Sequence, residues 1–352
     1  MKIAPIIRAI KNFNSSRQEL IHCRLVHTGQ HYDDRLSRIF FEELGLPEPD
    51  VNLGVGSGTQ AEQTGRIMVE FEKDLIQNPQ DLVIVVGDVT STMACTIVAK
   101  KLNTKVAHVE GGIRSFDISM PEEINRIVTD SLADYFFTTS EVANENLLRT
   151  GIKHDQIFFV GNTMIDSLRY SLDKLKKPAV WEKIQLEDQA YFVLTLHRPS
   201  NVDNLQKLRN ILQDLEGGVD GKIIVFPVHP RTKKNFDMLA GEFKLITPVD
   251  PLGYFEFVYL LQHAAGVITD SGGVQEETTV LGVPCITLRS STERPETVTE
   301  GTNELIGDDQ DKLHSALKKI IAGSWKSGKI PPLWDGRTAE RIVSVLPGLL
   351  EN

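Results

Sequence analysis

Short apolar runs rich in β-branched residues alternate along this chain with longer segments in which apolar residues recur every three or four positions. The short runs predict strands, and the longer segments predict amphipathic helices. This alternation is typical of a parallel sheet with helices on both faces, and therefore of the α/β class. In the first half it predicts strands at residues 21–28, 82–86, 105–109, 134–138 and 157–160, and helices at 33–44, 61–77, 91–102, 121–132 and 141–150.

The alternation pauses between residues 172 and 189, where charged residues, Pro178 and the isolated Trp181 indicate a helix end and a hinge. It then restarts, with strands predicted at residues 191–196, 222–227, 244–247, 266–269 and 285–288. Two successive sheets of similar size predict two Rossmann-like domains, residues 1–167 and 190–335, which face each other across a cleft. Ligands in such sheets bind at the carboxyl ends of the strands.

The start of the chain departs from this plan. A domain of this kind opens with a strand, whereas residues 5–10 directly follow the first methionine and have the pattern of a helix. We therefore expect the first strand of the first domain to be missing from this sequence.

Length and composition narrow the class of protein. The chain has 352 residues, 41% hydrophobic and 24% charged, which suits two soluble domains. Its net charge of -10 argues against nucleic acid or anionic lipid as a partner. No apolar run is long enough to span a membrane and the amino end lacks a secretion signal, so we expect a cytoplasmic protein. Neither the histidines nor the three cysteines have metal-ligand spacing, and we expect the cysteines to be buried, reduced thiols.

Two carboxylates come directly after predicted strands. Asp88 follows the strand at 82–86 and Glu110 follows the strand at 105–109, each with glycine beside it. Both positions lie at the edge where ligands bind. The alternatives are structural, because Asp88 is also placed to cap the next helix and Glu110 to accept backbone N–H groups of the glycine turn.

A third carboxylate, Glu122, opens the helix predicted at 121–132, four residues before Arg126 and on the same face. An exposed ion pair at an ordinary helix start is the simpler interpretation. If Glu122 instead joins Asp88 and Glu110 in a cleft, like charge and burial would raise its pKa and suit it to proton donation near neutral pH.

The second half carries a different signal. Small residues including Ser271 and Gly272 follow a predicted strand and open a helix, where free N–H groups and the helix dipole favour a phosphate. Glu276 and Glu277, one turn later, form an acceptor pair placed to bind ribose hydroxyls, and Arg294 is placed to neutralise phosphates. The two histidines His197 and His229 end strands of the same sheet and are suited to phosphate binding or proton transfer, or are simple loop residues.

Together these motifs resemble the non-hydrolysing UDP-N-acetylglucosamine 2-epimerases. The matching segments, in chain order, are GDVTST, HVEGGIRS, MPEEINR, HRPSNVDN, PVHPR, TDSGGVQEE and TERPE. The resemblance covers nearly the whole chain. It implies the glycosyltransferase-B architecture, UDP held mainly by the second domain, a sugar that reaches the first domain, and a terminal helix within residues 336–352 that returns to the first domain. It also implies a UDP-sugar as the substrate and, commonly, a homodimer.

The resemblance also assigns roles to individual residues. Asp88, Glu110 and Glu122 match the acid/base carboxylates of the family, and His197 matches its catalytic histidine. The positions that match substrate contacts are Lys2, Arg126, His229, Phe257, Ser271, Gly272, Glu277 and Arg294.

Three departures from the family pattern stand out. The family has a glycine-threonine-arginine-proline-glutamate loop before the lysine that Lys2 matches, and this loop is absent from the sequence. Pro199 and Ser200 stand where many members have an acidic residue. Gly111 stands where alanine is usual.

The expected reaction inverts C2 of UDP-N-acetylglucosamine by elimination of UDP to 2-acetamidoglucal and readdition, with no metal and no cofactor. Four alternatives stay open at this point. They are an epimerase of a related UDP-diacetamido or deoxy amino sugar, a hydrolysing epimerase, a glycosyltransferase of the same architecture, and a non-catalytic UDP-sugar binder.

Overall fold

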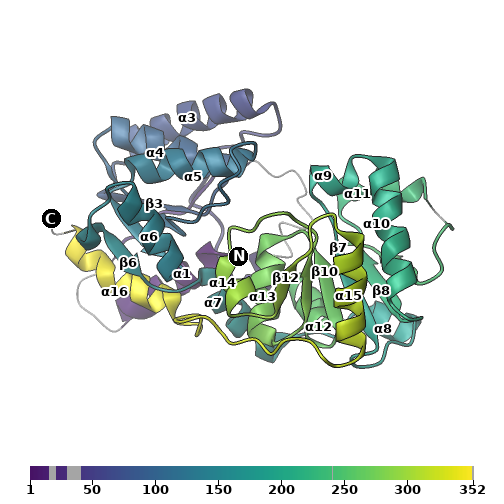
Figure 1. The fold of residues 1–352 in the computed structure, drawn as a ribbon. Helices are drawn as coiled ribbons and strands as arrows, with labels where there is room; N and C mark the ends of the chain where they lie inside the picture. Colours follow the sequence, from purple (N-terminus) through teal and green to yellow (C-terminus); the bar gives the residue numbers. More distant parts are fainter. Residues whose placement is uncertain (16–20, 30–40, 240, 351–352) are drawn as a thin grey trace. The chain divides into compact units, whose positions relative to one another are not determined.

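The computed structural model describes residues 1–15, 21–29, 41–239 and 241–350. It divides into two compact units, the first formed by Met1–Arg169 with Pro332–Asn352 and the second by Tyr170–Pro331. Each unit contains a parallel sheet with helices packed against it (Figure 1). The predicted fold class, α/β with two Rossmann-like domains, is confirmed.

The first unit has a four-stranded sheet in the order β3-β4-β5-β6 and a separate pair of short parallel strands. The four strands are β3 (Leu82–Val86), β4 (Lys105–Val109), β5 (Tyr135–Thr138) and β6 (Ile157–Phe159). Val86 pairs with Val109, so β3 and β4 end side by side. All pairs are parallel, and the residues that follow each strand therefore lie at one edge of the sheet.

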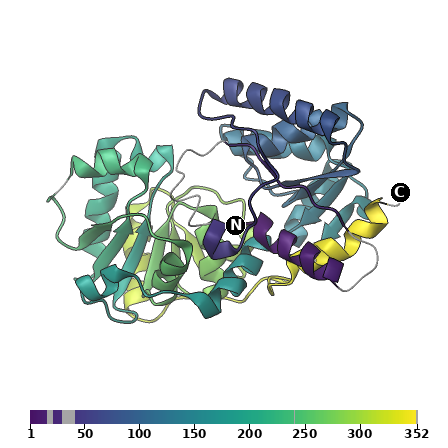
Figure 2. The same ribbon diagram turned by 180° about the vertical axis from the view of Figure 1, so that it is seen from behind.

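The strands of this sheet are buried on both faces because successive side chains point to opposite sides. Val85, Val106 and Phe136 pack with helices α3 (Gln60–Gln77), α4 (Thr90–Lys101) and α6 (Glu141–Arg149). The opposite face, with Ala107 and Phe137, packs against α1 (Ile3–Ser15) and α16 (Thr338–Leu350). The views from both sides show α1 and α16 next to each other, and α5 (Pro121–Leu132) beside α4 (Figures 1 and 2).

The last segment of the chain is attached to the first unit by specific polar contacts. The Asp166 carboxylate accepts the N–H groups of Thr338 at 3.1 Å and Ala339 at 2.7 Å, which satisfies free amides at the start of α16. The fully buried Trp334 donates its ring N–H to the carbonyl of Thr139 at 3.0 Å. Residues 332–335 therefore belong with the first unit.

The second unit has a six-stranded parallel sheet in the order β12-β11-β10-β7-β8-β9. The strands are β7 (Tyr191–Thr195), β8 (Ile223–Pro227), β9 (Ile246–Val249), β10 (Gly266–Thr269), β11 (Cys285–Thr287) and β12 (Asn303–Leu305). Numbered from β7, this is the 3-2-1-4-5-6 order of the Rossmann fold. From β7 the strands are added first on one side of the sheet and then, from β10, on the other. Ligands bind at this point of reversal in such sheets.

Helices cover both faces of this second sheet as well. One face packs against α10 (Leu205–Gly218), α11 (Pro230–Asp237) and α15 (Gln310–Ile321), and the other against α8 (Ala179–Lys183), α12 (Tyr254–Gln262) and α13 (Gly272–Leu281). The segment 172–189 lies in the second unit, where the Trp181 ring packs edge-on against Tyr191 at 5.6 Å. The remaining short helices are α7 (Thr163–Ser171), α9 (Pro199–Val202), α14 (Pro295–Thr299) and the 3-10 turns His154–Gln156 and Leu172–Lys174.

Two predicted strands differ from the structure by two or more residues at an end, and two observed strands were not predicted. The strand predicted at 21–28 is only β1 (Val26–His27), which pairs with the unpredicted β2 (Val51–Asn52). The strand predicted at 244–247 is displaced to β9, and β12 was not predicted. Of the helix predicted at 33–44, residues 41–44 are helical and 33–40 lie outside the described residues. No helix within the described ranges has the length and apolar character needed to cross a bilayer.

Candidate active site

The edge of the first sheet brings two of the predicted site residues together. Asp88 follows β3 and Glu110 follows β4, and the Gly87 N–H donates to the carbonyl of Val109 at 3.0 Å, which joins the two strand ends. Glu110 has a φ of 72°, a left-handed conformation that side chains with a Cβ rarely adopt. Such strain persists where surrounding contacts enforce it and is most frequent at functional sites.

Each of these carboxylates is held by a cation. The Arg126 guanidinium binds Oδ2 of Asp88 through Nε at 3.1 Å and Nη2 at 2.5 Å, and Lys2 binds Oε2 of Glu110 at 2.7 Å. The Lys2 side chain also passes over Gly87, where an added Cβ would lie 3.3 Å from its ammonium nitrogen. Four predicted residues, Lys2, Asp88, Glu110 and Arg126, thus form one polar cluster at the sheet edge.

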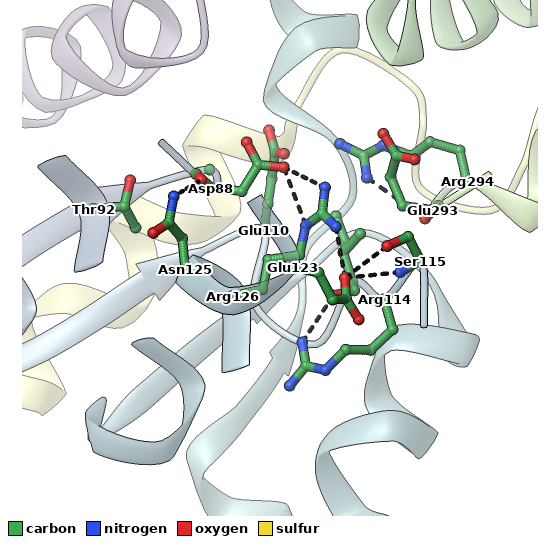
Figure 3. A network of polar contacts seen from close by, with 12 residues as sticks. Asp88, Thr92, Glu110, Arg114, Ser115, Glu123, Asn125, Arg126, Glu293 and Arg294 are labelled. Atoms are coloured by element: carbon green, nitrogen blue, oxygen red, sulfur yellow. Dashed lines mark hydrogen bonds and ion pairs between the residues drawn. The ribbon is translucent and has the colours of Figure 1, made fainter. Parts of the chain in front are cut away.

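In the first turn of helix α5 the buried carboxylate is Glu123 rather than Glu122. Glu123 accepts the N–H and the hydroxyl of Ser115, at 2.9 and 3.0 Å, and the Arg126 guanidinium at 2.7 Å. Burial acts to raise the pKa of Glu123, but these donors outweigh burial and hold it below the usual value. Figure 3 shows Arg126 between Asp88 and Glu123.

Glu122 is exposed, as in the simpler interpretation of its motif as an ordinary helix start. Its side chain is exposed in the first turn of α5, while Glu123 and Arg126 are on the buried side of the helix. The spacing of four residues was compatible with a pair between Glu122 and Arg126, but Arg126 pairs with Glu123 and Asp88. The inward face of α5 begins one residue later, at Glu123.

The second sheet places His197 and Asp270 at its reversal point, after β7 and β10. Asp270 is fully buried and accepts the backbone N–H groups of His197 at 3.1 Å and Arg198 at 3.0 Å. Its Oδ1 lies 2.8 Å from Nδ1 of His197. Burial acts to raise the pKa of Asp270, but His197 and the backbone donors hold it below its usual value. Asp270 therefore orients the His197 ring and shapes the loop that carries it.

The residues after Asp270 form a helix start without a side-chain cap. Ser271 precedes α13 in an extended conformation, its side chain makes no capping hydrogen bond, and the first turn has no acidic residue. At Gly272 an added Cβ would come within 2.8 Å of Oε1 of Glu293. The N–H groups and dipole at the start of this helix favour an anion. Because Gly272 has no side chain, another group can come close to its backbone.

Further along α13 two neighbouring glutamates are buried and differently paired. Oε1 of Glu277 accepts the Tyr254 hydroxyl at 2.8 Å, and Glu276 pairs with Nε of Arg294. Burial raises the pKa of Glu277 to about 8, with Tyr254 acting in the opposite direction and the charge of Glu276 adding to the rise. Glu277 is thus held by Tyr254, and Arg294 is held by Glu276, the neighbour of Glu277.

The last two predicted residues of this unit differ in placement. The His229 and His197 rings are 5.7 Å apart, and Nδ1 of His229 accepts the N–H of Arg231 at the start of α11. Burial lowers the pKa of His229, the charges of His197 and Arg231 lower it further, and Asp270 opposes them. Phe257 is half-buried in α12 and packs against the apolar cluster under the sheet.

The described residues contain no group of three or more histidine, cysteine or acidic side chains placed to hold a metal ion. Cys95 and Cys285 are buried thiols, as expected, but Cys23 is exposed. The expectation for Cys23 was wrong because the strand predicted around it is not part of the four-stranded sheet.

The fold and the polar groups at the ends of both sheets define the class of protein, a two-domain α/β protein with a candidate ligand-binding edge on each unit. Comparison with known proteins identifies the family. The sequence profile of the family described as UDP-N-acetylglucosamine 2-epimerase matches residues 14–347. A UDP-N-acetylglucosamine 2-epimerase of Methanocaldococcus jannaschii is 45% identical, over 98% of this chain and 95% of that protein. The chain belongs to the UDP-N-acetylglucosamine 2-epimerase family.

Two further comparisons concern the ligand. A crystal structure of the Methanocaldococcus jannaschii UDP-GlcNAc 2-epimerase in complex with UDP-GlcNAc and UDP matches with a TM-score of 0.88 and 44% identity, over 99% of this chain and 96% of that one. A UDP-2,3-diacetamido-2,3-dideoxy-D-glucuronate 2-epimerase of Pseudomonas aeruginosa is 40% identical, over 91% of this chain and 92% of that protein.

Sequence reasoning did not predict the partners that hold the site residues in place. Glu123 lies next to the residue that we selected, and only the buried face of α5 distinguishes the two. Asp270 stood within a quoted motif, directly after a buried strand, which is the signal that identified Asp88. Tyr254 gave no sequence signal, because its contact with Glu277 joins residues 23 positions apart.

Proposed function

We propose that this chain is a non-hydrolysing UDP-N-acetylglucosamine 2-epimerase, which interconverts UDP-N-acetylglucosamine and UDP-N-acetylmannosamine. Membership of the family and the 45% identical relative support the activity. The structural observation that carries the proposal is the pair of carboxylates, Asp88 and Glu110, held at adjacent strand ends by Arg126 and Lys2. Carboxylates fixed at a ligand-binding edge are suited to proton exchange.

The chemistry explains why both a proton acceptor and a phosphate site are needed. The C2 hydrogen of the sugar is not next to a carbonyl group, so deprotonation alone is very unfavourable. When a carboxylate removes this proton while the C1–O bond breaks, the products are 2-acetamidoglucal and UDP, which leaves with the bonding electron pair. Readdition of UDP at C1, with protonation of C2 from the opposite face, gives the epimer.

In this proposal the first unit exchanges the proton. Asp88, Glu110 and Glu122 act as the acid/base group, and Lys2 and Arg126 hold the first two carboxylates while contacting substrate. The exposure of Glu122 leaves its carboxylate accessible to a substrate, whereas Glu123 is occupied by Ser115 and Arg126.

The second unit binds UDP in this proposal. Ser271 and the N–H of Gly272 bind the diphosphate with Arg294 and His229, and Glu277 accepts the ribose hydroxyls. A positioned donor that stabilises the charge on the leaving phosphate contributes about 3 kcal/mol to catalysis. His197, oriented by Asp270, completes the catalytic set, and Phe257 contacts the substrate.

A second candidate substrate is a UDP-diacetamido sugar. The 40% identity to the Pseudomonas aeruginosa diacetamido-glucuronate epimerase favours it, since the same strand-end carboxylates serve C2 inversion of either sugar. The two substrates differ at C3 and C6, so the comparison of their rates decides between them.

Product analysis tests the proposal. The purified chain is incubated with UDP-N-acetylglucosamine, and the products are followed by proton and phosphorus NMR. We expect a mixture of the two UDP-sugars with no free sugar. Release of N-acetylmannosamine with UDP would establish the hydrolysing reaction instead. In a parallel incubation with the UDP-diacetamido sugar, turnover of that substrate alone would establish the second candidate. Binding of UDP-N-acetylglucosamine without any turnover would leave a non-catalytic binder.

We also propose a cytoplasmic homodimer. Phe116 and Ile118 are 77% and 67% exposed and line one hollow with Ile127 and Ile152, an apolar surface of the kind that subunits bury. Light scattering coupled to gel filtration should give twice the monomer mass, and a monomer mass at micromolar concentration would contradict the dimer. Cell fractionation tests the compartment.

A further inference from the structure

A buried histidine that the mechanism does not use connects the two strand ends of the first unit. His108 lies in β4, two residues before Glu110, and its side chain is fully buried. Its Nε2 lies 2.8 Å from the carbonyl oxygen of Gly87, the residue before Asp88. Its Nδ1 lies 2.6 Å from Oδ1 of Asp130 in α5. One imidazole ring therefore joins the Asp88 turn, the Glu110 strand and the Arg126 helix.

Asp130 is held as a carboxylate by donors from a third segment. Its Oδ2 accepts the Gly112 N–H at 3.0 Å and the Arg114 guanidinium at 2.6 Å. Burial acts to raise the pKa of Asp130, but His108 and Arg114 outweigh burial and hold it below the usual value. Asp130 thus connects the turn after Glu110 to the His108 ring.

The two partners of His108 determine its protonation state. A peptide carbonyl oxygen only accepts hydrogen bonds, and an ionised carboxylate only accepts them too. A neutral imidazole carries one N–H and satisfies one of these partners, whereas an imidazolium carries two and satisfies both. Burial acts to lower the pKa of His108, but Asp130, the Gly87 carbonyl and the charge of Glu110 together raise it above the usual value.

We propose that His108 is a positioning residue held as an imidazolium between Gly87 and Asp130, where it sets the relative placement of the Asp88 and Glu110 carboxylates. The proposal rests on the proposed C2 epimerisation for its catalytic consequence, but the protonation state is a property of the folded chain alone.

The charged groups that face His108 come from three segments. They are Asp130 on α5, Glu110 at the end of its own strand, and Arg114 in the following loop, which acts through Asp130. Because the pKa of His108 is raised on folding, its contribution to stability is complete at pH values below the pKa of an unfolded histidine. It is lost as the pH rises through the folded-state pKa. The alkaline limb of the rate profile should therefore follow the titration of His108.

Nitrogen-15 NMR of the histidine-labelled full chain tests the protonation state. The chain has nine histidines, and the spectrum of His108→Asn assigns the resonances of His108. We expect both ring nitrogens of His108 to carry protons at neutral pH, and one of them to lose its proton only above the pKa of about 6.5 that is usual for a histidine side chain. A His108 ring with a single N–H at neutral pH would overturn the proposal.

The kinetic test uses C2 exchange in deuterated water. For His108→Asn and His108→Gln we expect kcat to fall by about tenfold to a hundredfold, the effect of misplacing a catalytic group by about 1 Å, with KM and the affinity for UDP little changed. The matched control, His154→Asn, should keep the wild-type kcat. If both variants fail to fold, the wild-type pH profile decides, because activity that stays constant through the titration of His108 refutes a positioning role.

Failure of this inference is distinguishable from failure of the proposed function. A wild-type chain without C2 exchange contradicts the proposed function and the positioning role, whatever the NMR result. A wild-type chain with full exchange and a neutral His108 contradicts the inference alone.

Discussion

The carboxyl ends of the two sheets use their acidic residues in opposite ways. In the first unit Asp88 remains 23% exposed, and its side chain is held by Arg126. In the second unit Asp270, at the equivalent kind of position after a strand, is fully buried, and its oxygens accept the N–H groups of His197 and Arg198. One edge leaves its carboxylate partly accessible, whereas the other uses its carboxylate to shape a loop and leaves the start of α13 without a side-chain cap. In the proposed function, the same Rossmann-like design serves proton exchange on one unit and phosphate binding on the other.

The largest expected effect comes from Asp88, the partly accessible carboxylate of the first edge. Asp88→Asn keeps the shape of the side chain and removes its charge, so kcat for C2 exchange should fall by about a hundredfold or more, as for loss of a general acid or base. The affinity for UDP, measured by calorimetry, should persist. Asp81→Asn, at the exposed residue before β3, is the matched control. An Asp88→Asn variant with normal exchange and weakened UDP binding would reverse the roles that we assign to the edges.

Two neighbouring glutamates on α5 allow a direct comparison of an exposed carboxylate with a buried one that is held by other side chains. Glu122→Gln should lower kcat by about a hundredfold without changing the unfolding free energy, because the side chain is exposed. Glu123→Gln removes the charge that pairs with buried Arg126, so the unfolding free energy should fall by about 3 kcal/mol. Denaturant unfolding of both variants checks this. Equal stability of the two variants would contradict the structural role of Glu123.

On the second edge the expected effect is on affinity. Ser271→Ala removes a hydroxyl that makes no capping bond and is free to donate to the diphosphate. The affinity for UDP should fall by about tenfold to a hundredfold, since a hydrogen bond to a charged group contributes roughly 1.5–3 kcal/mol. Ser324→Ala, at an exposed position after α15, is the control. Unchanged affinity by calorimetry would remove Ser271 from the phosphate site.

The smallest expected effect is a pH dependence of the unfolding free energy. Burial raises the pKa of Glu277 from 4.5 to about 8, so the folded chain retains a proton that the unfolded chain releases between these values. The unfolding free energy therefore decreases as the pH rises through this window. Glu277→Gln removes this dependence and should gain stability relative to the wild type as the pH increases, whereas Glu300→Gln, at an exposed residue, should not. A constant difference across the window would show that Glu277 is not titrating there.

The sequence predicted the strand ends better than it predicted what holds them. Asp88, Glu110 and His197 follow apolar strands, and parallel strands place such residues at one edge whatever the helices do. The choice between Glu122 and Glu123 depends instead on the rotation of α5 about its axis, which is set by packing. The contact of Asp130 with His108 joins residues 22 positions apart, and neither residue alone shows a pattern that predicts it.

The strands that differ from the prediction are the least enclosed ones. β1 and β2 form a two-residue pair outside the four-stranded sheet, so the apolar run at 21–28 is not matched by a neighbouring strand of equal length. β9 and β12 are the two edges of the second sheet, with a neighbour on one side only. Edge strands need fewer apolar residues than central ones, and their boundaries are correspondingly harder to predict.

The central claim is that the carboxylates of the first unit break and remake the C2–H bond. Incorporation of solvent deuterium tests it most directly. The wild-type chain is incubated with UDP-N-acetylglucosamine in deuterated water, and C2 of both UDP-sugars is observed by NMR alongside the Asp88→Asn variant. The account predicts deuterium at C2 of both sugars with the wild type and exchange reduced by about a hundredfold with the variant. Epimerisation with C2 hydrogen fully retained, or equal exchange by the two proteins, would contradict it.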